Sequence, residues 1–169
     1  MNKVLTIIGV IGLVIVGILN VSTWVTYKSG CGDNLALAAD ASTMNGAYEK
    51  LNLAIQYMEL HNLTGGNSAF FFRTPRNNLG IWYQQRKEGL AGLARLIEQK
   101  AQNPSSVMPV DESNELMKLK DLLKDNGSVT EPQHIDVFPA QGAYLFGYIV
   151  FGLLLIVGGV WWFVEYTNF

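Results

Sequence analysis

The stretch that decides the fold is VLTIIGVIGLVIVGILNVSTWVTY, which runs from Val4 to Tyr27 without a charged residue. A second uncharged stretch, GAYLFGYIVFGLLLIVGGVWWFV, runs from Gly142 to Val164. Each is longer than the roughly 20 residues that a helix needs to cross the hydrocarbon core of a bilayer. The sequence therefore predicts an all-α membrane protein that spans a bilayer twice.

The two stretches divide the chain into a short start, two spans, a helical domain between the spans and a short tail. The predicted boundaries are 1–3, 4–27, 28–141, 142–164 and 165–169. The first span is expected to remain as a signal anchor. Its apolar run exceeds the roughly 7–15 residues of a cleavable signal, and no small-residue cleavage site follows it directly.

Charges that flank the spans indicate the orientation in the membrane. Lys3 and the α-amine favour a cytoplasmic N-terminus, whereas Lys28 favours the opposite side. We expect both termini in the cytoplasm and the central domain outside. In a bacterium this places the chain in the inner membrane, with a periplasmic domain.

Small and polar residues gather on particular faces of both spans. With about 100° of rotation per residue, one face of the first span carries Thr6, Gly9, Gly12, Gly17, Asn20 and Thr23. In the second span, Ala143, Gly147 and Gly158 share one face, and Gly152 and Gly159 share another.

These faces predict helix–helix contacts. Small residues let helices approach closely, and an amide in hydrocarbon needs a hydrogen-bonding partner. The expected packing positions are Gly9, Gly12, Asn20, Gly147, Gly152 and Gly159. The alternative is that glycine is simply frequent in membrane helices. Because one face suffices to join the two spans, a second face predicts other integral membrane subunits or further copies of the chain as partners, besides the surrounding lipid.

The central domain is predicted to be an antiparallel bundle of about three helices. After a flexible hinge at Ser29–Gly32, apolar residues at alternating spacings of four and three predict a long first helix at residues 34–61. This heptad comprises Leu37, Ala41, Met44, Tyr48, Leu51, Ile55 and Met58. It is either the core stripe of a single bundle or a coiled-coil seam shared between protomers.

Two further helices are expected in this domain. One begins at Thr74-Pro75 and ends before Asn103, with an inward row of Leu79, Tyr83, Arg86, Leu90, Leu93 and Ile97. The other covers Asp111 to Asp125 and is closed by Asn126-Gly127. The following stretch, 128–141, is expected to be an extended lead-in to the second span.

Aromatic and arginine residues alternate in the most distinctive stretch of the domain. The candidate external contact consists of Phe70, Phe71, Phe72, Arg73, Arg76 and Trp82. Such residues are enriched in interface hot spots, but they equally suit the end of the bundle core or the bilayer interface. A net charge of −2 and an external location argue against nucleic acid as the partner.

The sequence offers little for catalysis or for cofactors. The single cysteine, Cys31, excludes an internal disulfide and leaves either a bridge between two protomers or a shielded free thiol. His61 and His134 lack companions at metal-ligand spacing, so no metal and no other cofactor is expected. Glycosylation sequons at Asn62 and Asn126 matter only in a eukaryotic secretory setting.

These observations favour a non-catalytic subunit that scaffolds or stabilises a larger membrane assembly. The alternative is a sensor or ligand-binding module, since two spans around an external bundle resemble in layout the input half of bacterial transmembrane receptors. With only a short tail after the second span, its signal would pass laterally to a membrane partner. Buried polar groups beside Arg86 would favour this alternative, while a membrane-active homo-oligomer is a third class, for which the spans lack a polar stripe.

Overall fold

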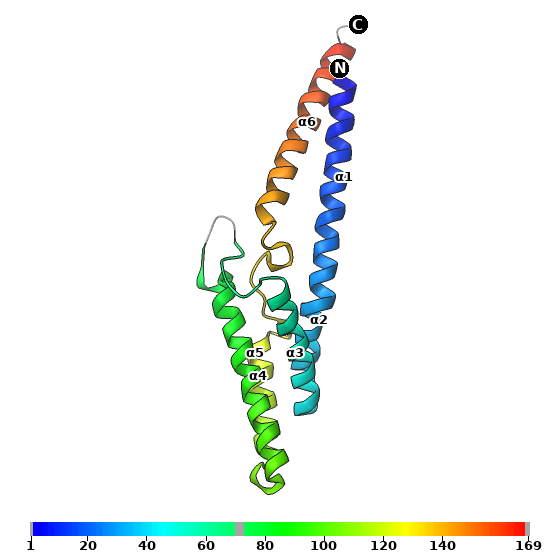
Figure 1. The fold of residues 1–169 in the computed structure, drawn as a ribbon. Helices are drawn as coiled ribbons and strands as arrows, with labels where there is room; N and C mark the ends of the chain where they lie inside the picture. The colour runs from blue at the N-terminus through cyan, green and yellow to red at the C-terminus, as the bar shows by residue number, and fades with distance from the viewer. Residues whose placement is uncertain (1, 70–72, 168–169) are drawn as a thin grey trace. The chain divides into compact units, whose positions relative to one another are not determined.

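The computed structural model describes residues 2–69 and 73–167, and these are mostly helical (Figure 1). The chain divides into two compact units. One, called the span unit, comprises Met1–Val25 and Val137–Phe169, and the other, called the helical domain, comprises Thr26–Asp136. The contacts within the chain thus separate its two terminal stretches from the segment between them.

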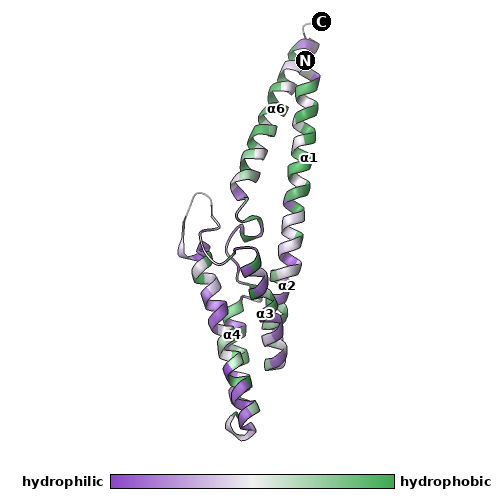
Figure 2. Ribbon diagram, viewed as in Figure 1, coloured by the Kyte–Doolittle hydropathy of each residue, from purple (hydrophilic) through white to green (hydrophobic). Residues whose placement is uncertain are grey.

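The span unit is built from two long apolar helices, α1 (Asn2–Tyr27) and α6 (Gln141–Thr167), which lie side by side (Figure 1). The helical run Lys3–Ala39, which begins with α1, and the run Gln141–Glu165 are long and apolar enough to cross a membrane. Figure 2 shows both helices as hydrophobic over most of their length. Side chains such as Ile18 and Phe146 are 63% and 68% exposed, as expected for surfaces that face lipid.

The described residues of the helical domain form four α-helices and a small hairpin. The helices are α2 (Asp33–Ala39), α3 (Met44–Leu60), α4 (Leu79–Gln102) and α5 (Pro109–Leu123). The hairpin pairs β1 (Lys124–Asp125) with β2 (Ser128–Val129) in antiparallel register. Shorter turns are η1 (Lys28–Gly32), η2 (Pro75–Asn77), η3 (Pro104–Ser106) and η4 (Ile135–Val137).

Leucines from every helix of the domain meet in one core. Helix α3 packs against α2 and α4, and α5 packs against the same two helices. Figure 1 shows α3 and α4 running in opposite directions. The fully buried leucines include Leu35, Leu51, Leu79, Leu93 and Leu123, each with 0% exposure. Burial of one such side chain stabilises the fold by about 1.5–3 kcal/mol.

The prediction of one unbroken helix at 34–61 is wrong. The chain leaves the helix after Ala39 and re-enters it at Met44, because Thr43 is extended and its hydroxyl accepts a hydrogen bond from the Gly46 amide at 3.2 Å. This local cap favours a new helix start over continuation of the heptad. Leu37 is consequently 54% exposed, and the buried stripe begins at Met44.

The predicted hinge at Ser29–Gly32 is also replaced by regular structure. Residues Lys28–Gly32 form one π-helical turn that leads directly into α2. Turns of this type widen a helix locally and re-aim its side chains. Here the turn places Cys31 in the interior of the domain.

Two helix boundaries differ from the prediction for local reasons. Thr74 precedes the short turn η2, whereas α4 is capped by Asn78, whose side chain accepts from the Ile81 amide at 3.1 Å. Asn126 and Gly127 have φ values of 49° and 83° and connect the hairpin strands instead of closing a helix. An Asn-Gly pair with positive φ at both positions is the favoured two-residue hairpin turn.

Candidate functional site

The closest approach between α1 and α6 depends on two glycines. A Cβ added at Gly9 would lie 2.8 Å from the backbone nitrogen of Leu155, and one at Gly158 would lie 2.8 Å from that of Thr6. Because backbone atoms cannot move aside like a flexible side chain, any larger residue at either position separates the helices. The contact is therefore a close backbone approach of the kind that small residues permit in membranes.

Two more glycines extend this contact along the helices. A Cβ at Gly12 would overlap the ring of Phe151, and a Cβ at Gly147 would lie 3.0 Å from Val16 Cγ2. Near the other end of the contact, the Tyr144 hydroxyl donates to the Leu19 carbonyl at 3.4 Å. The packing positions Gly9, Gly12 and Gly147 thus lie between the two spans.

The remaining glycines of the spans do not lie in the contact between α1 and α6. A Cβ at Gly17, Gly152 or Gly159 would meet no described atom of another segment within 4 Å. We call these three residues the open glycines. Asn20 is half-buried, and its side-chain amide makes no hydrogen bond with the residues that the structure describes.

The helical domain contains a cleft of about 690 Å³. The beginning of α4, the turn before it and the segment around the hairpin form its walls. The lining residues are Thr74, Pro75, Arg76, Asn77, Ile81, Trp82, Gln85, Arg86, Asp125, Thr130, Glu131, Pro132 and Gln133.

Arg86 lies at the inner wall of the cleft and is only 1% exposed. Its Nη2 donates to the Thr130 carbonyl at 2.8 Å, and its Nη1 donates to Gln85 Oε1 at 3.1 Å. The indole N–H of Trp82 donates to the same Thr130 carbonyl at 2.8 Å, and the guanidinium carbon lies 4.7 Å from the centre of the Trp82 ring. Hydrogen bonds and a cation–π contact therefore fix the guanidinium in place.

A carboxyl group and two further polar side chains lie near this guanidinium. Glu131, Tyr27 and Cys31 all lie close enough to Arg86 to interact with it electrostatically. Tyr27, the last residue of α1, and Cys31, in the π-helical turn η1, are 3% and 0% exposed. The cluster thus joins residues from both ends of the domain's sequence.

Burial changes the acidity of both charged groups in the cluster. Desolvation lowers the pKa of Arg86 to about 10 and raises the pKa of the Glu131 carboxyl above its ordinary value. A hydrogen bond with the Tyr27 hydroxyl and the charges of Lys28 and Arg86 oppose the upward shift in the pKa of Glu131, and Asp136 adds to it. Burial therefore disfavours the charged form of each group relative to the same group in water.

One polar atom of this cluster lacks a partner. Arg86 Nε is buried and makes no hydrogen bond with a described residue, whereas the Tyr27 hydroxyl and the Glu131 carboxyl are close enough to share one. A buried polar group without a partner costs about 1–3 kcal/mol, so water or a ligand is expected to satisfy Arg86 Nε. Arg86 and Glu131 both line the cleft, from which such a partner can reach Arg86.

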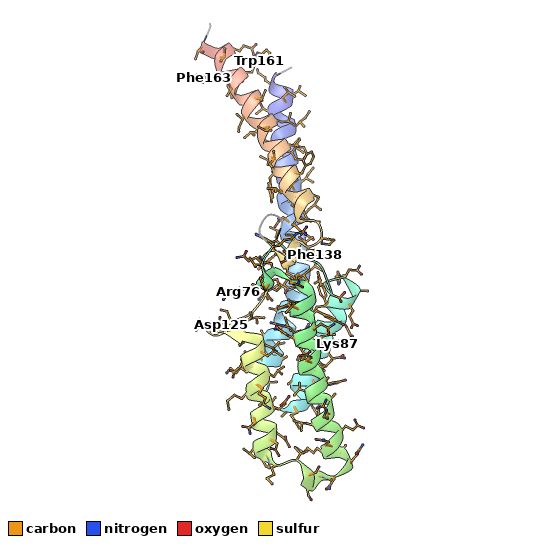
Figure 3. The ribbon with its side chains drawn as sticks, turned by 90° about the vertical axis from the view of Figure 1, so that its left-hand side faces the viewer. Arg76, Lys87, Asp125, Phe138, Trp161 and Phe163 are labelled. Carbon is orange, nitrogen blue, oxygen red and sulfur yellow. The ribbon has the colours of Figure 1, made fainter. Side chains whose placement is uncertain are left out.

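Two more charged side chains, Arg76 and Asp125, line the exposed part of the cleft. Figure 3 shows them on the same side of the domain. Within the described part of the chain, neither they nor Arg86 and Glu131 form a salt bridge. The cleft thus offers two cationic and two acidic side chains that no ion pair occupies.

The residues of the expected external contact fall into different environments. Trp82 is 5% exposed and belongs to the core, because its ring packs on Arg86 and its indole is hydrogen-bonded. Arg73 and Arg76 are exposed, and Arg76 lines the cleft. Phe70, Phe71 and Phe72 lie outside the described residues. Cys31, considered for a bridge between protomers, is fully buried, so its thiol does not face a second chain.

Sequence reasoning did not identify Glu131, Asp125 or Tyr27. The signal that could have pointed to them is Arg86, a charged residue in the inward row of α4 that requires a partner. Which residue meets it depends on the fold of the segment after α5, where no periodicity guides prediction. Among the described residues, no group of three or more His, Cys, Asp and Glu side chains is placed to hold a metal ion.

Comparisons with known proteins add no family or fold. No family model, no curated protein and no solved structure matches this chain.

Proposed function

We propose that this chain is a non-catalytic two-span subunit that assembles laterally with other membrane-spanning helices, either of different proteins or of further copies. The observation that carries the proposal is the division of the span glycines. Gly9, Gly12, Gly147 and Gly158 are used between α1 and α6, whereas the open glycines are not. Gly152 and Gly159 lie seven residues apart, and so on one face of α6, which suits a further helix.

Asn20 supports the same proposal. An amide in a membrane helix is stabilised by a hydrogen bond across to a neighbouring helix, with a typical contribution of about 0.6–2 kcal/mol. The described residues of this chain supply no such bond to its side chain. A neighbouring subunit that packs on this part of α1 would supply it.

We place both termini in the cytoplasm and the helical domain outside, in a bacterial inner membrane. Lys3 before the first span supports this orientation, because basic residues are retained on the cytoplasmic side. The domain would then offer its exposed surfaces to partners outside the membrane.

The test is co-extraction of partners with variants of the open glycines. Substituting Gly152→Leu and Gly159→Leu together fills the open face, where an added Cβ meets nothing within 4 Å. The contact between α1 and α6 should survive. We expect the partners, or the additional copies, to be lost from the complex extracted in a mild detergent.

The matched control adds bulk to another lipid-exposed face of the same helix. Val157 is 51% exposed, so Val157→Phe should leave the complex intact. Retention of the partners by the double glycine variant, or their loss from the control as well, would contradict the assembly face proposed for α6.

The cleft favours a second candidate function, a ligand-binding module that signals laterally to a membrane partner. Glu131 lies beside the buried Arg86, and both residues line a cavity whose size suits a small molecule. Binding of small molecules to the full chain tests this candidate separately from assembly.

A further inference from the structure

The charges of the cleft restrict what can bind there. Arg76 and Arg86 attract anions, but Asp125 and Glu131 repel them, and the converse holds for a simple cation. A ligand with a single charge therefore meets attraction and repulsion in the same cavity. A ligand with both charges can place each one against its opposite.

A buried polar atom without a partner supports an acidic group on the ligand. Arg86 Nε is a donor without an acceptor within the described chain. Because Arg86 is 1% exposed, its guanidinium is already desolvated and held by bonds to Thr130 and Gln85. Such preorganised groups lose little further freedom when a ligand binds.

The remaining lining and the volume limit the size of the ligand. The cleft measures about 690 Å³, within the range of roughly 300–1,000 Å³ typical of small-molecule sites. Ile81, Trp82, Pro75 and Pro132 contribute apolar surface beside the charged groups. The cavity thus suits a small molecule with an apolar part and two charged groups.

We propose that this cleft binds a small zwitterion of amino-acid type, which carries one carboxylate and one ammonium group. The carboxylate accepts hydrogen bonds from the guanidinium groups of Arg76 and Arg86. The ammonium group donates to the carboxylates of Asp125 and Glu131. This inference rests on the second candidate function and names its class of ligand.

The experiment measures ligand binding to the full chain in detergent micelles. Each proteinogenic L-amino acid is tested for an increase in thermal stability, because a ligand that binds only the folded state stabilises it. For the amino acid with the largest effect, calorimetry then compares it with the analogue that lacks the ammonium group and the analogue that lacks the carboxylate. We expect each analogue to bind on the order of tenfold more weakly, since each loses a charge-assisted hydrogen bond.

Variants in the cleft locate the binding site. Arg76 and Asp125 are exposed, so Arg76→Gln and Asp125→Asn should fold, and each should weaken binding by on the order of tenfold. The matched controls are Arg95→Gln on α4 and Asp121→Asn on α5, which make the same chemical changes at exposed positions outside the cleft. The controls should bind as the unchanged chain does.

The outcomes separate failure of the inference from failure of the function. If the analogue that lacks the ammonium group binds as tightly as the amino acid, the cleft is an anion site. The proposal of a zwitterionic ligand is then wrong, while the ligand-binding function stands. If Arg76→Gln and Asp125→Asn bind as the controls do, the ligand lies elsewhere and the inference is also overturned. If no amino acid stabilises the chain, the inference is overturned, whereas the second candidate function falls only when small molecules of other classes fail to bind as well.

Discussion

Replacing Gly9 by alanine should weaken the contact between the spans, whereas the same replacement at Gly17 should not. The Cβ that Gly9→Ala adds would lie 2.8 Å from the Leu155 nitrogen, which is 0.6 Å inside the lower limit of ordinary contact at 3.4 Å. Overpacking of this kind costs about 1–3 kcal/mol. At Gly17 no described atom of another segment lies within 4 Å, so alanine should gain up to about 1 kcal/mol from its higher helix propensity.

The assay is reversible unfolding of the full chain in mixed micelles. Energy transfer between one dye on α1 and one dye on α6 reports the separation of the two helices. We expect the Gly9 variant to separate the helices at a lower denaturant concentration than the unchanged chain, and the Gly17 variant to do so at the same or a higher one. Equal stability of the two variants would refute the role assigned to Gly9. A destabilised Gly17 variant would show that Gly17 packs closely against another segment of the chain.

Two more predictions concern the buried cluster of the helical domain. Because burial raises the folded-state pKa of Glu131, its contribution to stability is most favourable below the unfolded-state pKa and is lost as the pH rises through the raised folded value. Glu131→Gln should therefore raise the free energy of unfolding near neutral pH and flatten this dependence in chemical denaturation, and an unchanged pH profile would contradict the assignment. Cys31 is 0% exposed, so its thiol should react with a maleimide only after unfolding, and rapid labelling of the folded chain would show that the cluster is open.

Composition and periodicity account for the parts of the fold that depend on one segment at a time. An uncharged apolar run must form its backbone hydrogen bonds within itself, which determines the helices α1 and α6. The inward row of α4 is similarly correct at Leu79, Tyr83, Arg86 and Leu93, which are all buried. The apolar periodicity of a helix predicts its buried face even when the segment that covers this face is not known.

Prediction failed where two local signals competed or where distant segments met. At Thr43 a side-chain cap overrides a heptad that continues through it, and at Asn126-Gly127 the preference for a hairpin turn overrides the closure of a helix. The cleft depends on the position of Glu131 relative to Arg86, residues separated by helix α5 and the hairpin. Only tertiary packing determines that contact.

The mass of the complex that contains the unchanged chain tests the central claim most directly. The full chain would be extracted from its native membrane in a mild detergent and weighed intact by native mass spectrometry, with each subunit identified. Lateral assembly predicts a fixed ratio of this chain to other membrane-spanning subunits or to further copies of itself. A single copy, recovered alone under conditions that preserve known membrane complexes, would contradict it.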